Sequence, residues 1–340
     1  MDHARQRPSR PTLADVAERA GVSSKSVSRV VNGEAHVRPE LAARIRAAID
    51  ELGYRPDHRA RDLASGPAVR SVGYVQVDAA NPFFAAVYRG LEDVLGAQGI
   101  LLVAGSTDAS PARERELLQA LIDFRVGGLI VAAAEGSDEL LAREITYGTP
   151  LVCVDRVMAE PACDTVVSSN RASMRRAVEH LLSRRHERIA FMGGRPEVWT
   201  ASERLEGYRE AVAAAGVPAW EITGVDQVEA ADHATRGLLD TPSPPTALVT
   251  GQDRITTGAI AALHAMGREH EVALFGFDEL PFTEQLQPSI SVVAQDPRYM
   301  GARAAQLLLS QIAEPGRAPE LVVVEAPLIH RASGDIPPAD

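Results

Sequence analysis

Residues 12–32 read TLADVAERAGVSSKSVSRVVN and have the pattern of two short helices joined by a tight turn. Thr12 followed three residues later by Asp15 is a signal that caps the N-terminus of a helix. Apolar residues then recur at helical spacing, which predicts a first helix with one buried stripe. Gly21 can end that helix because glycine takes positive φ without strain, and Ser23 can cap a second helix. The stretch therefore predicts a helix-turn-helix.

The second helix is predicted to run to about Val31 and to have two unlike faces. Its valines face inward, and its polar side carries Ser24, Lys25, Ser28 and Arg29. A recognition helix uses its N-terminal residues on base edges, and lysine and arginine suit guanine or phosphate. We therefore predict that Ser24, Lys25 and Arg29 contact DNA. The alternative is an ordinary surface helix with a solvated face, and the paired helices and the glycine turn argue against it.

A third helix is predicted from Pro39 to about Leu52, because proline favours the first turn and apolar residues follow at helical spacing. This helix completes a DNA-binding head over residues 10–56. The segment after Gly53 is too short and too polar to hold a helix without external contacts. We therefore expect residues 57–68 to form a hinge that folds only when it is docked.

The combination of AGVS at residues 20–23, VSRVVNG at 27–33 and ELGYRP at 51–56 resembles the LacI/GalR family of bacterial transcription regulators. The resemblance implies that two hinges pair over the centre of a pseudo-palindromic operator. It also implies that Leu63 enters the minor groove as an apolar wedge beside Ala60, although packing on the following domain is an alternative for Leu63. Pattern and resemblance together give these DNA-contacting residues: Thr12, Ser23, Ser24, Lys25, Ser28, Arg29, Asn32, Tyr54, Arg59, Ala60 and Leu63.

The charge of the chain is unevenly distributed. The formal net charge is −11, yet residues 1–66 hold 12 Lys and Arg against 9 Asp and Glu, a balance of +3. The remaining residues hold 23 against 37, a balance of −14. A basic head on an acidic body keeps unspecific DNA binding modest and makes the affinity fall steeply with salt.

Several classes of protein are excluded by what the chain lacks. No run of about eighteen apolar residues suggests a membrane span, and the polar N-terminus is unlike a signal peptide, so we expect a cytoplasmic protein. The nine histidines show no metal-ligand spacing, and we predict no metal and no cofactor. Two cysteines are too few for a disulfide framework. Cys153 lies in an apolar run that predicts a buried thiol, and Cys163 lies in a loop with no catalytic partner nearby.

From about Val69 the chain alternates short apolar runs with amphipathic helical stretches. This rhythm predicts an α/β fold in which two doubly wound parallel-sheet lobes follow the all-α head and hinge. The predicted strands lie at 71–77, 100–104, 128–132, 151–154, 165–167, 188–192, 222–225, 247–250, 272–277, 291–294 and 321–324. The family resemblance implies three crossings between the lobes, near 168, 295 and 324. We therefore assign to 69–332 an effector-binding and dimerisation domain, with an N-lobe at about 69–167 and 296–323, a C-lobe at about 168–294 and 324–332, and a tail at 333–340.

Ligands collect at the carboxyl ends of parallel strands, and two facing sheets would enclose them in a cleft. The candidates are therefore the polar residues just past each strand, together with nearby aromatic rings. The predicted effector-binding residues are Asn81, Phe83, Phe84, Asp155, Arg156, Arg204, Gln252, Asp278 and Gln295. Carboxylates, arginines and amides bind hydroxyl groups, and an aromatic ring can cover the apolar face of a sugar. The set predicts a polyhydroxylated ligand.

This half of the chain resembles periplasmic sugar-binding proteins, most closely the ribose-binding type. Positions 155, 156, 204, 278 and 295 match that pattern, whereas Gln252 stands where asparagine is usual. The longer amide would reach further into the cleft and favour a smaller ligand. Plainer interpretations exist for several candidates: an Asp155–Arg156 pair, a surface charge at Arg204, and core packing for Phe84.

These expectations combine into a dimeric repressor of a pseudo-palindromic operator, with its DNA affinity controlled allosterically by a sugar or related polyol. One head contacts one half-site, so a palindrome needs a homodimer, and the C-terminus lacks the leucine heptads of a coiled-coil tetramer. A purine-type or phosphorylated corepressor is the alternative ligand. An enzyme on a Rossmann-like fold is a remote alternative, because the chain has no G-x-G-x-x-G and no G-x-S-x-G. Whether the ligand induces or corepresses stays open.

Overall fold

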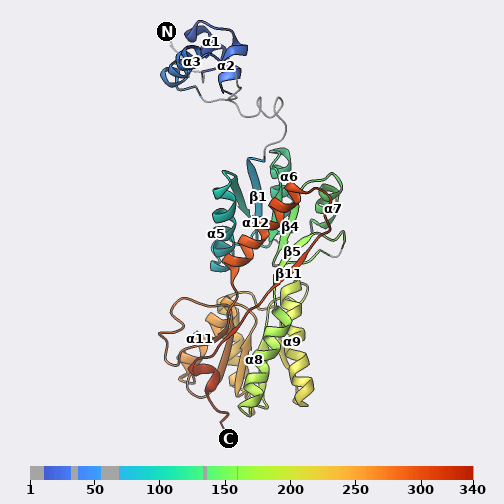
Figure 1. Ribbon diagram of the computed structural model, residues 1–340. Helices are drawn as coiled ribbons and strands as arrows, with labels where there is room; N and C mark the ends of the chain where they lie inside the picture. Colours follow the sequence, from blue (N-terminus) through green and yellow to red (C-terminus); the bar gives the residue numbers. More distant parts are fainter. Residues whose placement is uncertain (1–10, 32–36, 55–68, 133–135, 159, 340) are drawn as a thin grey trace, which may run out of the picture. The chain divides into compact units, whose positions relative to one another are not determined.

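The computed structural model describes residues 11–31, 37–54, 69–132, 136–158 and 160–339. Contacts divide the chain into two compact units, Met1–Ala68 and Val69–Asp340, which we call the head and the body (Figure 1). The predicted hinge, with Arg59, Ala60 and Leu63, lies outside the described residues, and so does Asn32.

The head contains the helix-turn-helix that the sequence predicts, followed by a third helix. Its helices are α1 (Leu13–Ala20), α2 (Ser24–Val31) and α3 (Pro39–Leu52). At the start of α1, the Asp15 backbone N–H donates to the Thr12 hydroxyl and the Thr12 backbone N–H donates to the Asp15 carboxylate, as in a capping box. The centre of the head holds one fully buried residue from each helix: Val16, Val27 and Ile45. Helices this short are marginal alone, so this shared core stabilises all three.

The first lobe of the body is a parallel six-stranded sheet with helices on both faces (Figure 1). Its strand order is β11-β5-β4-β3-β1-β2. The strands are β1 (Ser71–Gln76), β2 (Leu101–Ser106), β3 (Leu129–Ala132), β4 (Leu151–Val154), β5 (Asp164–Ser168) and β11 (Leu321–Val324). The helices are α5 (Pro82–Ala97), α6 (Pro111–Asp123), α7 (Asp138–Thr146) and α12 (Pro297–Ala313).

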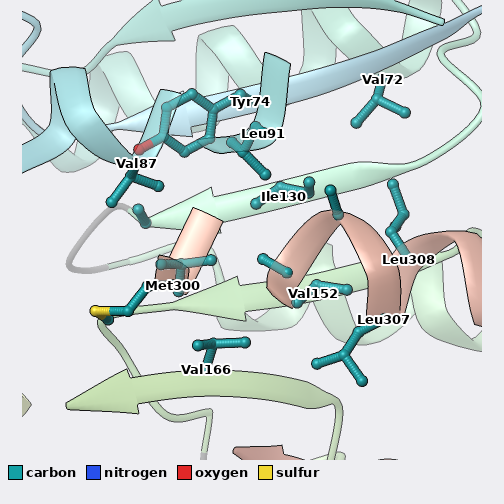
Figure 2. Packing of buried hydrophobic residues seen from close by; sticks show 14 of the residues in the cluster. Val72, Tyr74, Val87, Leu91, Ile130, Val152, Val166, Met300, Leu307 and Leu308 are labelled. Atoms are coloured by element: carbon teal, nitrogen blue, oxygen red, sulfur yellow. The ribbon is translucent and has the colours of Figure 1, made fainter. Parts of the chain in front are cut away.

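The two faces of this sheet have separate cores. α5 and α12 cover one face, where Leu91 and Leu308 pack with Ile130 of the sheet (Figure 2). α6 and α7 cover the other face, in a cluster that includes Cys153. α5 and α12 also approach each other closely, since a Cβ on Gly90 would lie 2.0 Å from the backbone oxygen of Arg298. Only glycine fits at that crossing.

The second lobe repeats the architecture with one departure. Its strand order is β12-β10-β9-β8-β6-β7, and β12 pairs antiparallel with β10. The strands are β6 (Ile189–Met192), β7 (Trp220–Ile222), β8 (Ala247–Thr250), β9 (Ala273–Phe277), β10 (Ser291–Val293) and β12 (Leu328–Ile329). The helices are α8 (Asn170–Ser183), α9 (Trp199–Ala215), α10 (Val228–Leu239) and α11 (Asp253–Met266). The α/β fold class with two doubly wound lobes is confirmed.

The strand predicted near 222–225 is present but lies earlier in the chain, because β7 begins at Trp220 and ends at Ile222. Gly224 takes a φ of 78° and its N–H bonds to Gly194 O, so the chain has left the sheet there. α8 was not predicted between 167 and 188. Its buried stripe includes the polar residues Asn170 and Ser173, which weakens the apolar pattern of the sequence there.

The chain crosses between the lobes three times, between β5 and α8, between β10 and α12, and between β11 and β12. The tail predicted to begin at 333 needs correction, because a 3-10 turn at Ala332–Asp335 packs on β9. The Ser333 hydroxyl donates to Leu274 O at 2.6 Å and accepts the Ser291 N–H at 2.9 Å, so this residue belongs to the second lobe. In the described part of the chain, every helix is too short or too polar to cross a membrane.

Candidate functional site

A cavity of about 490 Å³ lies between the two lobes of the body. It is lined by the segments that follow β1 and β4 in the first lobe and by the segments that follow β6, β8, β9 and β10 in the second. Each of the nine residues predicted to bind the effector lines it: Asn81, Phe83, Phe84, Asp155, Arg156, Arg204, Gln252, Asp278 and Gln295. Segments more than 200 residues apart in sequence thus meet at one site.

Arg204 is a buried cation on α9, and three contacts hold its guanidinium group in place. Its Nε donates to Asn170 Oδ1 at 2.7 Å, and its Nη1 donates to Gly251 O at 2.7 Å. The guanidinium carbon lies 3.8 Å from the centroid of the Phe277 ring. The side chain is therefore held before any ligand arrives, and it is not the surface charge that was its plainer interpretation.

Asp278 follows β9 in a left-handed conformation with a φ of 73°. Its Oδ1 accepts a hydrogen bond from the Gln295 amide at 2.5 Å, and Gln295 Oε1 is buried with no partner in the described part of the chain. Burial raises the pKa of the Asp278 carboxyl, while the charge of Arg204 and the Gln295 hydrogen bond oppose that rise. The pair thus offers a fixed carboxylate beside an unsatisfied amide oxygen.

Asp155 follows β4 and also has a left-handed backbone, with a φ of 57°. Its Oδ1 is buried and has no hydrogen-bond partner among the described residues. Burial raises the pKa of this carboxyl to about 7, Arg204 acts against the rise, and Asp278 adds to it. Asp155 and Asp278, one from each lobe, are thus electrostatically linked to the same arginine.

Arg156 lines the cavity, but its guanidinium group forms ion pairs with carboxylates of the first lobe. It forms ion pairs with Asp138 and with Glu114, the latter at 3.6 Å. The alternative interpretation, an ion pair between Asp155 and Arg156, is therefore wrong, because the guanidinium points to other carboxylates. Arg156 helps to shape the wall of the cavity and is not an uncompensated cation.

Aromatic rings line both sides of the cavity. Phe83 and Phe84 form an edge-to-face pair with centroids 5.2 Å apart, and Phe84 is also part of the first-lobe core. Asn81 accepts the Phe83 backbone N–H at 2.8 Å and so caps α5. Trp199, the first residue of α9, lines the cavity from the second lobe. Gln252 is the residue that precedes the first turn of α11, and its amide lies 3.4 Å from Val225 O.

Several charged residues of the cavity were not predicted from the sequence, and Asp78 and Arg254 are the most informative of them. Asp78 follows β1, Arg254 lies on α11, and the two form an ion pair that joins the lobes. Asp78 lies just past a strand, so the rule that found Asp155 would have found it too. With these residues counted, the lining holds seven acidic side chains (Asp78, Asp138, Asp155, Glu197, Asp226, Asp253 and Asp278) and four arginines (Arg156, Arg195, Arg204 and Arg254).

In the head, the polar side of α2 is accessible. Ser24, Lys25 and Arg29 are exposed and Ser28 is half-buried. The hydroxyls of Thr12 and Ser23 accept backbone N–H groups at the starts of α1 and α2, so both residues have a capping role.

Tyr54 is another residue that the sequence predicts to contact DNA, and in the head it lies in the core. It is only 8% exposed and belongs to the core cluster of the head with Val16, Val27 and Ile45. A ring in that position contributes packing to the three helices, because most of its surface is covered by them.

Two protein families match parts of the chain. Residues 12–57 match the family described as bacterial regulatory proteins, lacI family, and residues 178–334 match a periplasmic binding protein-like domain. The ribose operon repressor of Halalkalibacterium halodurans is 34% identical over 307 residues, which cover 88% of this chain and 90% of the relative.

Two solved structures share the fold of this chain over nearly its whole length. A lac repressor dimer bound to operator and an anti-inducer superposes with a TM-score of 0.84 at 24% identity, over 96% of this chain and 99% of that chain. A complex of the transcriptional regulator CelR with cellobiose has a TM-score of 0.71 at 30% identity, over 95% and 100% of the two chains. A helix-turn-helix head followed by a two-lobed body of this type defines a DNA-binding transcription regulator and not an enzyme. The chain belongs to the LacI family of bacterial regulatory proteins.

Proposed function

We propose that the protein is a dimeric repressor whose affinity for a two-fold operator is set by a neutral sugar or polyol bound between its lobes. The observation that carries this proposal is that Asp155, Arg204 and Asp278 line one cavity, where the charge of the fixed Arg204 acts on two carboxyls that come from opposite lobes. Carboxylates and a guanidinium in that arrangement suit vicinal hydroxyls. The volume of about 490 Å³ falls within the range of small-molecule sites.

The charge of the cavity supports a neutral ligand. Seven carboxylates face four arginines there, and each arginine already interacts with the protein. A phosphate or a sugar acid would meet net negative charge and would have to break an existing ion pair to gain a cation. Neutral hydroxyls instead supply donors to the unpartnered oxygens of Asp155 and Gln295.

Relatives support the same class of ligand. One relative is named for a ribose operon, and the CelR structure contains cellobiose. Because the cavity is built from both lobes, a ligand that contacts both stabilises their closed arrangement. In the proposed mechanism this closure changes how two hinges are presented in the dimer, and DNA and sugar therefore influence each other reciprocally.

A ligand panel tests the effector class. The full chain is heated with D-ribose, D-glucose, cellobiose, ribose 5-phosphate and adenine, each at several concentrations. A true ligand at about one hundred times its Kd adds about 2.7 kcal/mol to the stability of the folded state, and the Tm rises accordingly. We expect a neutral sugar to raise the Tm and its phosphate to have no effect. A rise with ribose 5-phosphate or adenine alone would contradict the neutral-sugar proposal and support a phosphorylated or purine-type effector.

For the head we propose that Ser24 and Lys25 contact bases and that Arg29, Ser28 and Thr12 contact the DNA beside them. The proposal extends to Asn32, Arg59, Ala60 and Leu63, with Leu63 as the minor-groove wedge.

The variant Lys25→Ala tests the assignment to bases. Losing a good base contact costs about 1–3 kcal/mol of discrimination, so the variant should bind the preferred site more weakly and tolerate changes at one base pair. Arg46→Ala, an exposed arginine on α3, is the matched control. Fluorescence anisotropy on a set of operator variants measures both. If both variants lose affinity equally on all sequences, Lys25 contacts only phosphate.

A further inference from the structure

Two thiols lie next to each other in the first lobe. Cys153 is in β4, and Cys163 lies one residue before the start of β5. Both are free, and their sulfur atoms are 3.3 Å apart. β4 and β5 pair in parallel with Cys153 opposite Thr165, so Cys153 and Cys163 lie on the same face of the sheet, one diagonal step apart.

The geometry allows a bond after a small movement. A disulfide needs a sulfur separation of about 2.0 Å, so the two sulfur atoms must approach by about 1.3 Å. Diagonal neighbours in a sheet have Cα atoms about 7–8 Å apart, slightly beyond the usual reach of a disulfide. Cys163 precedes the paired residues of β5, so the backbone there can move towards β4 without breaking the ladder.

The two thiols differ in reactivity. A hydrogen bond with Cys153, contact with the Thr165 hydroxyl and the charge of Arg156 lower the pKa of Cys163 to about 7, against the effect of burial. The same hydrogen bond, together with burial, raises the pKa of Cys153. Cys163 is only half-buried, whereas Cys153 is buried. Cys163 is therefore the nucleophile, and Cys153 is positioned to resolve it.

We propose that Cys153 and Cys163 form a peroxide-responsive pair that closes to a reversible intramolecular disulfide. In the first step the Cys163 thiolate attacks one oxygen of hydrogen peroxide. The S–O bond forms, the O–O bond breaks, and the departing hydroxide takes up a proton, leaving water and a Cys163 sulfenic acid. In the second step the Cys153 sulfur attacks the Cys163 sulfur. The S–S bond forms, the S–O bond breaks, and the thiol proton leaves with the hydroxyl as a second water. The two thiols lose two electrons, and peroxide gains them.

The disulfide would act on the cavity because Cys153 is two residues from Asp155. The Asp155 backbone N–H donates to Val166 O at 2.9 Å, so β4 and β5 move together where Asp155 and Arg156 enter the cavity wall. The oxidised protein is therefore expected to tie together the two strands that carry these side chains. The thiol chemistry itself does not depend on the identity of the effector.

Thiol counting on the full chain tests the pair. The protein is treated with a small excess of hydrogen peroxide, denatured, alkylated with a maleimide and weighed by mass spectrometry. We expect both cysteines to become inaccessible to maleimide, the mass to fall by two hydrogens, the chain to stay a monomer on a non-reducing gel, and dithiothreitol to restore both thiols. Two remaining thiols, a sulfinic acid as the main product, or disulfides between chains would each overturn the proposal.

Variants assign the roles within the pair. Cys163→Ser should leave Cys153 unmodified by peroxide, and Cys153→Ala should let Cys163 form a sulfenic acid that no disulfide follows. Without treatment, the alkylation rate of the native protein at pH 7 should fall about tenfold or more in Cys163→Ser, because a thiol with a pKa of about 7 is half ionised there and an ordinary one is a few per cent ionised. If Cys163→Ser were alkylated as fast as the native protein, the assignment of the nucleophile would be contradicted, and this readout does not need the disulfide to form.

Discussion

The two lobes hold their parts of the cavity in different ways. In the second lobe, Arg204 is fixed by two hydrogen bonds and an aromatic ring, and Asp278 is fixed by the Gln295 amide. In the first lobe, Arg156 is turned towards neighbouring carboxylates, and Asp155 has an oxygen without a partner among the described residues. The charged groups of the second lobe are fixed before a ligand arrives, whereas the carboxyl of the first lobe has an unmet hydrogen bond that a ligand can satisfy, as the neutral Gln295 amide oxygen also has.

This difference indicates a division of roles in binding. Pre-arranged groups give affinity because little ordering is required when the ligand arrives. A group that gains its partner only in the complex favours the arrangement in which the ligand touches both lobes. We therefore expect the second lobe to provide most of the affinity and the first lobe to provide most of the closure. The variants below test this expectation with the sugar that gives the largest rise in Tm.

The largest effect is expected from Arg204→Ala. The change removes a cation whose charge acts on both Asp155 and Asp278, and it leaves Asn170 Oδ1 and Gly251 O without the donors that Arg204 supplies. Sugar affinity should fall about a hundredfold or more, which corresponds to about 3 kcal/mol. Isothermal titration calorimetry on the full chain measures it.

Arg209→Ala is the matched control for Arg204→Ala, because Arg209 lies on the same helix but is exposed and pairs with Glu221. It should bind sugar normally. Operator binding without sugar reports whether Arg204→Ala remains folded. If the folded variant kept its affinity within a few-fold, the second lobe would not hold the main binding group.

The two carboxyls should respond differently to replacement by the amide. Asp278→Asn should weaken sugar binding by about ten- to fiftyfold, because the new amide keeps one acceptor oxygen and the Gln295 amide already donates to one oxygen of this side chain. Asp155→Asn should cost only about two- to fivefold, because that carboxyl, with a pKa of about 7, is already half protonated at neutral pH. Equal losses in the two variants would remove the distinction between the lobes.

Much of this molecule could be predicted from local pattern. The head follows from contiguous signals, since the Thr12–Asp15 cap, the Gly21 turn and one polar face lie within a single stretch of about twenty residues. The strands Leu151–Val154, Ala247–Thr250 and Leu321–Val324 begin and end at the predicted residues, because short apolar runs between turns have clear limits.

The details of the cavity could not be predicted, because they depend on contacts between distant segments. Strand ends indicated which polar residues gather at one edge. They did not indicate that Arg156 turns to Glu114 and Asp138, or that Asp78 meets Arg254 across 176 residues of chain. The burial of Tyr54 could not be predicted for the same reason, since it depends on three helices and not on the neighbours of Tyr54 in sequence.

The pH dependence of the Tm, compared between the normal protein and Asp155→Asn, should isolate the contribution of the Asp155 carboxyl to stability. Burial raises the pKa of this carboxyl from 3.8 to about 7 in the folded state, so the folded protein holds the proton more tightly than the unfolded chain does. The stabilising contribution of the proton is fully present below about pH 4, declines as the pH rises towards 7, and is absent above that. Asp155→Asn removes this contribution. The Tm of the normal protein should therefore fall relative to that of the variant between pH 5 and pH 8. Parallel Tm profiles would mean that Asp155 keeps an ordinary pKa.

The smallest effect is expected at the ion pair that joins the lobes. Asp78 and Arg254 have side chains that are 25% and 38% exposed, and a pair in that setting is worth about 0.5–1 kcal/mol. If the pair helps closure, Asp78→Asn and Arg254→Gln should each weaken sugar binding by about two- to fivefold, and the double variant should be no worse than either single one. The pair Arg268–Glu271, which lies within the second lobe, is the control and should have no effect. Additive losses in the double variant would indicate two independent contacts. In that case the ion pair would not contribute to closure. Closure would then depend on the hydrogen bond that the ligand makes with Asp155, which would strengthen the proposed difference in the roles of the two lobes.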